Sequence, residues 1–285
     1  MKSLEPLVLS NQGPLLIHAH ANGYPPEAYQ SFLEPFLDTY QTRAIYLRPF
    51  WPGSDYETLN NWRLFRDDYL TALPTHLEEA GKQSLIAMGH SLGGMTSLMA
   101  AIEAPERFRA LVLIEPTLFP SWQGFLMRIS APLNLFRYFH PLVRRTLRRR
   151  TVFSDKESMF QNYRRKNVFA GIPDHVLRDY VQGLAEGQLD GTVRSKYTPE
   201  WELRVYETGG SADPYVWKNL SRIPCPVLVL RGELSDTLAQ KTLERIALKL
   251  PRCEAVTVPS AGHLLPLEMP EHLAAIVLDF LDSVQ

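Results

Sequence analysis

One serine stands where nucleophilic catalysis would need it. Ser91 lies in the sequence GHSLGG, directly after the apolar run Ser84–Met88 and directly before the helical pattern Leu92–Glu103. A G-x-S-x-G sequence between a strand and a helix is typical of a sharp turn that projects a serine hydroxyl above the edge of a sheet. The helix that follows directs its N-terminal N–H groups at the same place, which favours negative charge there. The segment therefore predicts Ser91 as a nucleophile.

His263 is the candidate for the base that would activate this serine. It follows the apolar run Ala255–Val258 in the sequence PSAGHLLPLEMPEH, just before the last helical pattern of the chain. Gly262 allows the loop to bend tightly, and a histidine after a terminal strand can reach a group held at the same sheet edge. We expect His263 to accept the proton of Ser91.

Three carboxylates compete for the group that would orient the imidazole and stabilise its charged form. Asp236 and Glu233 follow the strand-like run PVLVL in the sequence RGELSD. Asp236 is preferred because the acid must extend beyond the tight turn at the strand end to reach the imidazole. Glu233 is a close competitor. Glu115 is the third alternative, since it directly follows the run ALVLI and another strand end on the same edge could supply the acid.

The segment HAHANGYPP, after the apolar run Leu15–His18, is the candidate for stabilising an oxyanion. Acyl transfer needs N–H donors aimed at the developing negative charge, and the loss of one donor costs about 3 kcal/mol. We expect the first donor to be the N–H of Leu92, next to the nucleophile. The second would be the N–H of Tyr24, because Gly23 permits a backbone angle that turns this group inward.

Strand-like and helix-like segments alternate in the first and last thirds of the chain. Short apolar runs between Gly, Pro or charged residues indicate strands buried on both faces, and their alternation with helices indicates a parallel sheet. The middle third has amphipathic stretches separated by Pro and Gly, and no convincing run typical of a buried strand. We therefore predict an α/β fold with a mostly parallel sheet of about eight strands, formed by residues 1–117 and 221–285. Residues 118–220 would form an inserted helical lid.

Composition narrows the class of protein. Of the 285 residues, 45% are apolar and 21% are charged, and the formal net charge is −1. These values are typical of a globular protein and argue against a nucleic-acid partner. Neither Cys225 nor Cys253 has metal-ligand spacing, and His18 and His20 lack a third ligand nearby, so we predict no metal and no cofactor. Without a secretory segment or a long apolar run, a cytoplasmic protein is expected.

Taken together, the segments HAHANGYP, GHSLGG, RGELSD and AGHLLPLEMPE resemble the α/β-hydrolase superfamily, in chain order and over essentially the full length. The resemblance implies a serine hydrolase whose triad is Ser91, Asp236 and His263. It also implies that Tyr24 and Leu92 supply the oxyanion hole. The early loop reads NGYP, where many members have His-Gly followed by an aromatic residue and Pro. A serine nucleophile argues against the related haloalkane dehalogenases and epoxide hydrolases, which use Asp at that place.

The expected reaction is two-step acyl transfer to Ser91 and then to water. A carboxylic ester, including a lipid-like one, is the leading substrate because the lid is rich in apolar and aromatic residues. The same groups would also serve carbon–carbon bond hydrolysis, thioester hydrolysis or cofactor-free perhydrolysis. A small-molecule receptor with a vestigial pocket is the alternative from another class. Candidates for the substrate pocket are Asn22, His90, Trp51, Phe119 and Trp122.

A basic cluster within the lid needs a separate interpretation. A solvated helix face is the ordinary role of such a cluster, and peripheral contact with an anionic lipid surface or an acidic headgroup is the alternative. Neither role involves stable insertion into a membrane. The cluster consists of Arg144, Arg145, Arg148, Arg149 and Arg150.

Overall fold

The main sheet has seven strands among the residues that the computed structural model describes, which are 3–120, 146 and 149–284. Only β1 is antiparallel to its neighbour, and the other five pairings are parallel. The sheet is therefore mostly parallel, as predicted, with one strand fewer than expected. In spatial order the strands are β1 (Leu7–Val8), β3 (Gln41–Ile45), β2 (Leu15–Ala19), β4 (Leu85–His90), β5 (Phe108–Ile114), β9 (Val227–Gly232) and β10 (Cys253–Val258).

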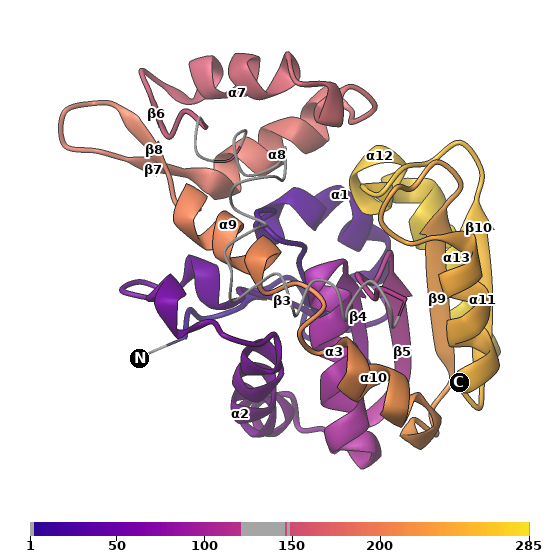
Figure 1. The fold of residues 1–285 in the computed structure, drawn as a ribbon. Coiled ribbons are helices and arrows are strands. Elements are labelled where there is room, and N and C mark those ends of the chain that lie inside the picture. Colours follow the sequence, from indigo (N-terminus) through magenta and orange to yellow (C-terminus); the bar gives the residue numbers. More distant parts are fainter. Residues whose placement is uncertain (1–2, 121–145, 147–148, 285) are drawn as a thin grey trace.

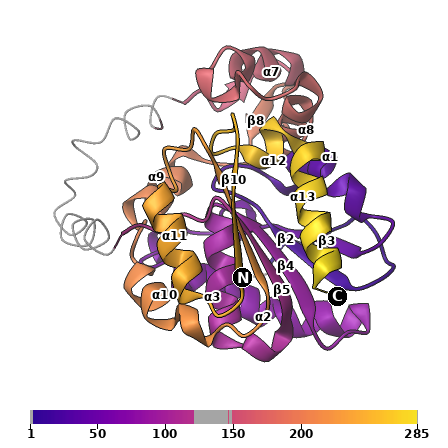
Figure 2. The same cartoon turned by 90° about the vertical axis from the view of Figure 1, so that its right-hand side faces the viewer.

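Helices cover both faces of this sheet (Figures 1 and 2). Every residue of β2, β4 and β9 is buried, which explains why these strands read as continuous apolar runs. α1 packs against α13, and α2 packs against α3. The helices of the core are α1 (Gln30–Leu33), α2 (Arg63–Ala80), α3 (Leu92–Glu103), α11 (Gln240–Lys249), α12 (Leu265–Glu268) and α13 (Pro270–Ser283).

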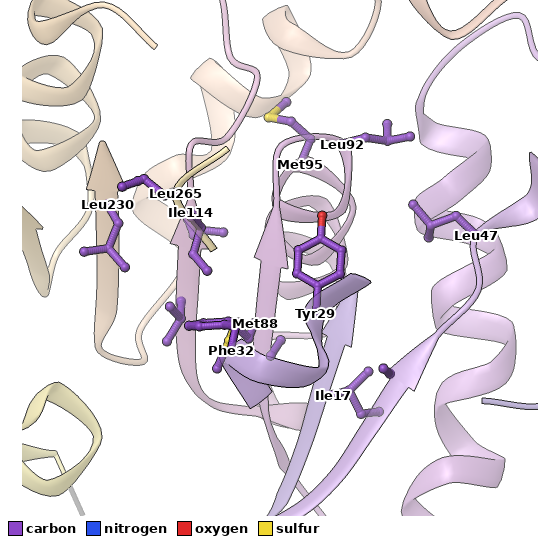
Figure 3. Close-up of a cluster of buried hydrophobic side chains, with 14 of the residues drawn as sticks. Ile17, Tyr29, Phe32, Leu47, Met88, Leu92, Met95, Ile114, Leu230 and Leu265 are labelled. Carbon is purple, nitrogen blue, oxygen red and sulfur yellow. The ribbon is translucent and has the colours of Figure 1, made fainter. Parts of the chain in front are cut away.

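Figure 3 shows part of the buried apolar core next to the carboxyl ends of the strands. Ile17 from β2, Met88 from β4 and Ile114 from β5 pack in one cluster. The aromatic rings of Tyr29 and Phe32 are fully buried in the same cluster. Close packing of this kind gives the strand ends a rigid support.

The chain between β5 and β9 contains strands as well as helices. Three short strands form a second, antiparallel sheet in the order β6-β8-β7. The insertion was expected to be helical, and its described part contains these three strands beside its helices, because strands of two or three residues are too short for an alternating pattern to show in the sequence. The described elements are β6 (Val152–Phe153), α7 (Lys156–Arg164), α8 (Asp174–Leu184), β7 (Ala185–Gly187), β8 (Val193–Ser195), α9 (Pro199–Glu207) and α10 (Asp213–Asn219).

Specific hydrogen bonds attach this insertion to loops of the core. The Tyr197 hydroxyl donates to Oδ1 of Asn22, in the loop after β2. The Trp201 indole donates to Oγ of Ser54 at 3.0 Å, and α8 packs against the short helix Pro26–Tyr29. Figure 1 shows α7, α8 and the small sheet gathered beyond one end of the main sheet. The insertion thus covers the loop that follows β2.

Candidate active site

Ser91 occupies a strained turn between β4, which ends at His90, and α3, which begins at Leu92. Its φ is 53° and its ψ is −112°. A residue other than glycine in such a conformation costs about 1–3 kcal/mol and persists only where the surrounding structure holds it. The Ser91 N–H donates to the Ile114 carbonyl at 2.9 Å, which supplies part of that support. Ser91 is buried, with only 7% of the residue exposed.

The glycines on either side of Ser91 are needed for close backbone approach. A Cβ atom on Gly89 would lie 2.4 Å from the Gly93 carbonyl oxygen. A Cβ atom on Gly93 would lie 2.1 Å from the Ala19 carbonyl oxygen, at the end of β2. Both distances are far below van der Waals contact, so α3 can pack this closely on β2 only with glycine at these positions.

Gly93→Ala is expected to lower the free energy of unfolding by about 2–3 kcal/mol, because backbone atoms must move to admit the methyl group. Without this clash, alanine would stabilise the helix by about 1 kcal/mol relative to glycine. The clash is therefore the reason why we expect the substitution to lower the free energy of unfolding. Urea unfolding of Gly93→Ala and of the control Gly187→Ala measures the effect, since no atom lies within 4 Å of a Cβ at Gly187. Equal stability of the two variants would contradict the close packing at Gly93.

The structure brings Ser91, His263 and a carboxylate into one hydrogen-bonded chain. His263 Nε2 lies 3.1 Å from Ser91 Oγ, and His263 Nδ1 lies 3.0 Å from Oε2 of Glu115. Ser91 follows β4, Glu115 follows β5, and His263 lies in the loop after β10. The carboxyl ends of parallel strands meet at one edge of a sheet, which is why residues far apart in sequence converge here.

Glu115 is held by donors on both of its carboxylate oxygens. Its side chain is fully buried, and its backbone φ of 50° is also in the left-handed region. The Gly232 N–H donates to Oε1 at 2.6 Å, and the Ser235 hydroxyl donates to Oε2 at 2.5 Å. A buried carboxylate is stable only with such partners. These donors also fix its orientation toward His263.

The expectation that Asp236 lies beside His263 is wrong. Asp236 is exposed, and its carboxylate accepts a hydrogen bond from the neighbouring Thr237 hydroxyl. Glu233 is exposed as well and accepts from the Ser260 N–H at 2.9 Å. The turn after β9 directs Ser235 inward and leaves both acidic side chains outside. Glu115, the third alternative, takes the place next to the imidazole.

The two expected oxyanion donors differ in their orientation. The Leu92 N–H is at the first position of α3 and is one of the four N–H groups that a helix leaves without an internal acceptor. The Tyr24 N–H instead donates to the Ala21 carbonyl at 3.2 Å, which closes a turn with Gly23 at φ 80°. The expectation that the Tyr24 N–H turns inward is therefore wrong. Among the described residues, no group accepts from the Asn22 N–H of the same turn.

A buried histidine links this turn to the segment that follows β3. His20 Nδ1–H donates to the Ala21 carbonyl at 2.7 Å, and its Nε2 accepts from the Leu47 N–H at 2.9 Å. Burial lowers the pKa of His20 to about 4, so the ring is neutral and can donate on one side while it accepts on the other. The backbone of Ala21, next to Asn22, is thus held from within the core.

Of the five pocket candidates, His90 and Trp51 do not line a pocket at Ser91. His90 is fully buried, and both of its ring nitrogens are engaged in hydrogen bonds. The Trp51 indole donates to the Tyr46 carbonyl and lines a separate cavity of about 510 Å³ next to Arg48, which Ser91 does not border.

The other three candidates come from the loop after β2 and from the chain after β5. The Asn22 side chain accepts from Tyr197 of the insertion, so Asn22 joins the core to the insertion. Phe119 lies four residues beyond Glu115, and its N–H donates to Oδ2 of Asp213 at 3.0 Å. Trp122 lies outside the described residues.

Thr117 is close to the nucleophile and carried no signal in the sequence. Its Oγ1 lies 2.9 Å from Ser91 Oγ. A carboxylate only accepts, so His263 Nδ1 carries a hydrogen toward Glu115, and Nε2, in the role of general base, accepts from Ser91. The Ser91 hydroxyl proton is then already used, which leaves the Thr117 hydroxyl as the donor to Ser91 Oγ.

The arginine cluster is not uniformly a solvated surface. Arg149 Nη1 lies 2.6 Å from Oε2 of Glu202 in α9, and the Arg149 side chain is only 17% exposed. The Arg150 guanidinium lies over the ring of Phe153 at 4.8 Å from its centre. Arg149 thus joins two parts of the insertion instead of facing solvent. Three members of the cluster, Arg144, Arg145 and Arg148, lie outside the described residues.

Comparison with known proteins identifies the family. Residues 15–276 match the family described as the alpha/beta hydrolase family. Because this match spans most of the chain, the protein belongs to that family and is an α/β-hydrolase enzyme, which confirms the resemblance seen in the motifs.

Individual relatives are distant. The uncharacterized hydrolase YugF of Bacillus subtilis is 27% identical over 217 residues, which cover 72% of this chain and 68% of that protein. Carboxylesterase YbfK of the same organism is 28% identical over 221 residues, 76% of this chain and 64% of that protein.

Solved structures share the fold at low identity. E-2-(acetamidomethylene)succinate hydrolase superposes with a TM-score of 0.77 at 20% identity and covers 98% of both chains. An esterase of M. tuberculosis gives a TM-score of 0.71 at 19% identity, covering 98% of this chain and 91% of its own.

In the described part of the chain, no helix is long and apolar enough to cross a membrane, and no cluster of His, Cys, Asp and Glu is arranged to hold a metal ion.

Proposed function

We propose that the protein is a serine hydrolase that cleaves a carboxylic ester through an acyl-enzyme intermediate. The observation that carries this proposal is the chain Ser91–His263–Glu115, with contacts of 3.1 and 3.0 Å. Ser91 is the nucleophile, His263 the general base and then general acid, and Glu115 the group that orients the imidazole. The carboxylesterase among the relatives supports an ester as the substrate class.

The reaction follows from the direction of these hydrogen bonds. His263 Nε2 takes the Ser91 proton while Oγ attacks the ester carbonyl carbon, and the imidazolium is stabilised by the Glu115 carboxylate. Collapse of the tetrahedral intermediate breaks the bond to the alcohol, which leaves with the proton from Nε2. Water then attacks the acyl-enzyme, again giving its proton to Nε2, and the acid leaves as Ser91 recovers its proton.

The oxyanion hole in this proposal uses the N–H groups of Leu92 and Asn22. Leu92 supplies a free helical N–H next to the nucleophile. The Asn22 N–H replaces the Tyr24 N–H, which is already bonded within the turn. A Cβ atom added to Gly93 would lie 2.7 Å from the carbonyl oxygen of His20, the residue after β2, so the turn after β2 adjoins the start of α3. We further propose that residues 118–220 act as a lid over this site.

Labelling with a fluorophosphonate tests the nucleophile directly. We expect the native protein to gain one phosphonyl group, mapped by peptide mass spectrometry to Ser91, because an activated serine attacks phosphorus as it attacks a carbonyl. Parallel assays with p-nitrophenyl esters of increasing chain length, a thioester and a diketone define the substrate class. Absence of labelling together with absence of turnover on all of them would point to a receptor and refute the proposal.

Thr117→Val is expected to lower kcat/KM for ester hydrolysis by about 2–10-fold, the effect of one lost hydrogen bond of ordinary strength. Valine keeps the shape of the side chain and removes only the hydroxyl that donates to Ser91 Oγ. Thr117→Ser is the matched control and should retain near-native activity, because it keeps the donor. Steady-state kinetics on both variants measures the effect. A lower kcat/KM in Thr117→Ser than in Thr117→Val would contradict the role of the Thr117 hydroxyl as the donor to Ser91 Oγ.

A further inference from the structure

His90, the residue before the nucleophile, links two loops of the site through its ring. Its Nε2 lies 2.9 Å from the backbone carbonyl oxygen of His263, and its Nδ1 lies 2.8 Å from the Tyr29 hydroxyl. The Tyr29 hydroxyl in turn lies 3.0 Å from the Ala21 N–H, in the turn after β2. His90 and Tyr29 are both fully buried. The proposed reaction mechanism uses neither side chain.

Only one arrangement of protons satisfies this chain of contacts. A carbonyl oxygen can only accept, so Nε2 of His90 carries a hydrogen and donates to His263. Burial lowers the pKa of His90 well below its usual value, so the ring is neutral and Nδ1 is an acceptor. The Tyr29 hydroxyl therefore donates to Nδ1, and its oxygen accepts from the Ala21 N–H. Every hydrogen bond points the same way, from Ala21 to the carbonyl of His263.

Both rings are enclosed by other side chains. The Tyr29 ring lies 4.3 Å from the ring of His18, and it packs in the apolar cluster of Figure 3. The His90 ring lies 5.2 Å from the His263 ring. A chain of fully satisfied buried polar groups is rigid, because breaking one contact leaves its partner unpaired in an apolar environment.

We propose that His90 is a positioning residue that, through Tyr29, holds the His263 loop and the Ala21–Tyr24 turn in fixed register with Ser91. The inference rests on the proposed ester hydrolysis, because its consequence is the placement of the base and of the Asn22 N–H relative to the nucleophile. Catalytic geometry is sensitive on this scale, since misplacement by 1 Å can lower a rate by about 100-fold. Neither His90 nor Tyr29 touches the substrate.

Two neutral amide variants separate positioning from general stability. In His90→Gln the side-chain amide reaches the position of Nε2 and can still donate to the His263 carbonyl. In His90→Asn the shorter amide reaches only the position of Nδ1, so it can contact Tyr29 but loses His263. We expect kcat per active site to fall by about 10–100-fold in the Asn variant and by less than about 5-fold in the Gln variant, with KM within about 3-fold in both.

The measurement combines fluorophosphonate titration of active sites, steady-state kinetics and thermal unfolding. Equal kcat in the native, Asn and Gln proteins would overturn the inference. It would also be overturned if both variants lost kcat equally and the loss only paralleled the decrease in their Tm. The failure of the hydrolase proposal itself is distinguishable, because the native protein would then neither label nor turn over an ester.

A second measurement needs no variant and does not depend on activity. A long-range 1H–15N NMR spectrum of the histidine-labelled native protein at neutral pH reports the tautomer of each ring. We expect His90 as a neutral ring with its hydrogen on Nε2. A hydrogen on Nδ1, or on both nitrogens, would overturn the inference.

Discussion

Replacement of Glu115 by Gln should lower kcat for ester hydrolysis by about 10³–10⁴-fold, the effect seen when the orienting carboxylate of such a triad becomes an amide. The amide cannot stabilise the imidazolium of His263. It can also present its N–H to Nδ1, which would favour the tautomer whose Nε2 carries a hydrogen and cannot accept from Ser91. Steady-state kinetics with a p-nitrophenyl ester, on protein whose fold is verified by circular dichroism, measures the loss.

Asp236→Asn and Glu233→Gln are the matched controls for this prediction. Both carboxylates follow β9 and both are exposed, away from the imidazole. Their removal should change kcat by less than about 2-fold, because surface substitutions without buried partners have small effects. A loss in Asp236→Asn as large as that in Glu115→Gln would show that the acid comes from the loop after β9.

The largest loss is expected for Ser91→Ala, at about 10⁵–10⁶-fold in kcat, because the acyl-enzyme can no longer form. The variant should also fail to react with a fluorophosphonate. Its unfolding temperature should stay close to native, because alanine and serine are similarly strained by the positive φ at this position.

A serine on the helix that follows Ser91 provides the control. Ser97 of α3 is fully buried, and its hydroxyl has no partner within the described residues. Ser97→Ala removes an unpaired buried polar group and should leave both turnover and labelling intact. Retention of more than about 1% of native activity by Ser91→Ala would refute the assignment of Ser91 as the nucleophile.

Features that depend on residues adjacent in the sequence could be predicted from the sequence alone. The strand, the turn and the helix around Ser91 are contiguous, and Gly89 is required by its close approach to Gly93 within that segment. Buried strands such as β9 read directly as apolar runs, because helices cover both faces of the sheet. The position of His263 followed from its place after the last strand. Short strands such as β6, with only two residues, left no pattern to read.

The residue order thus determined the strand–turn–helix of the nucleophile, the mostly parallel sheet and the loop that carries the imidazole. Only the tertiary structure decided among Asp236, Glu233 and Glu115, because that choice depends on which strand ends are neighbours and which side chains turn inward. β5 lies between β4 and β9, so Glu115 points into the space where Ser91 and His263 meet. The orientation of the Tyr24 N–H was likewise set by hydrogen bonds between groups that the sequence does not pair.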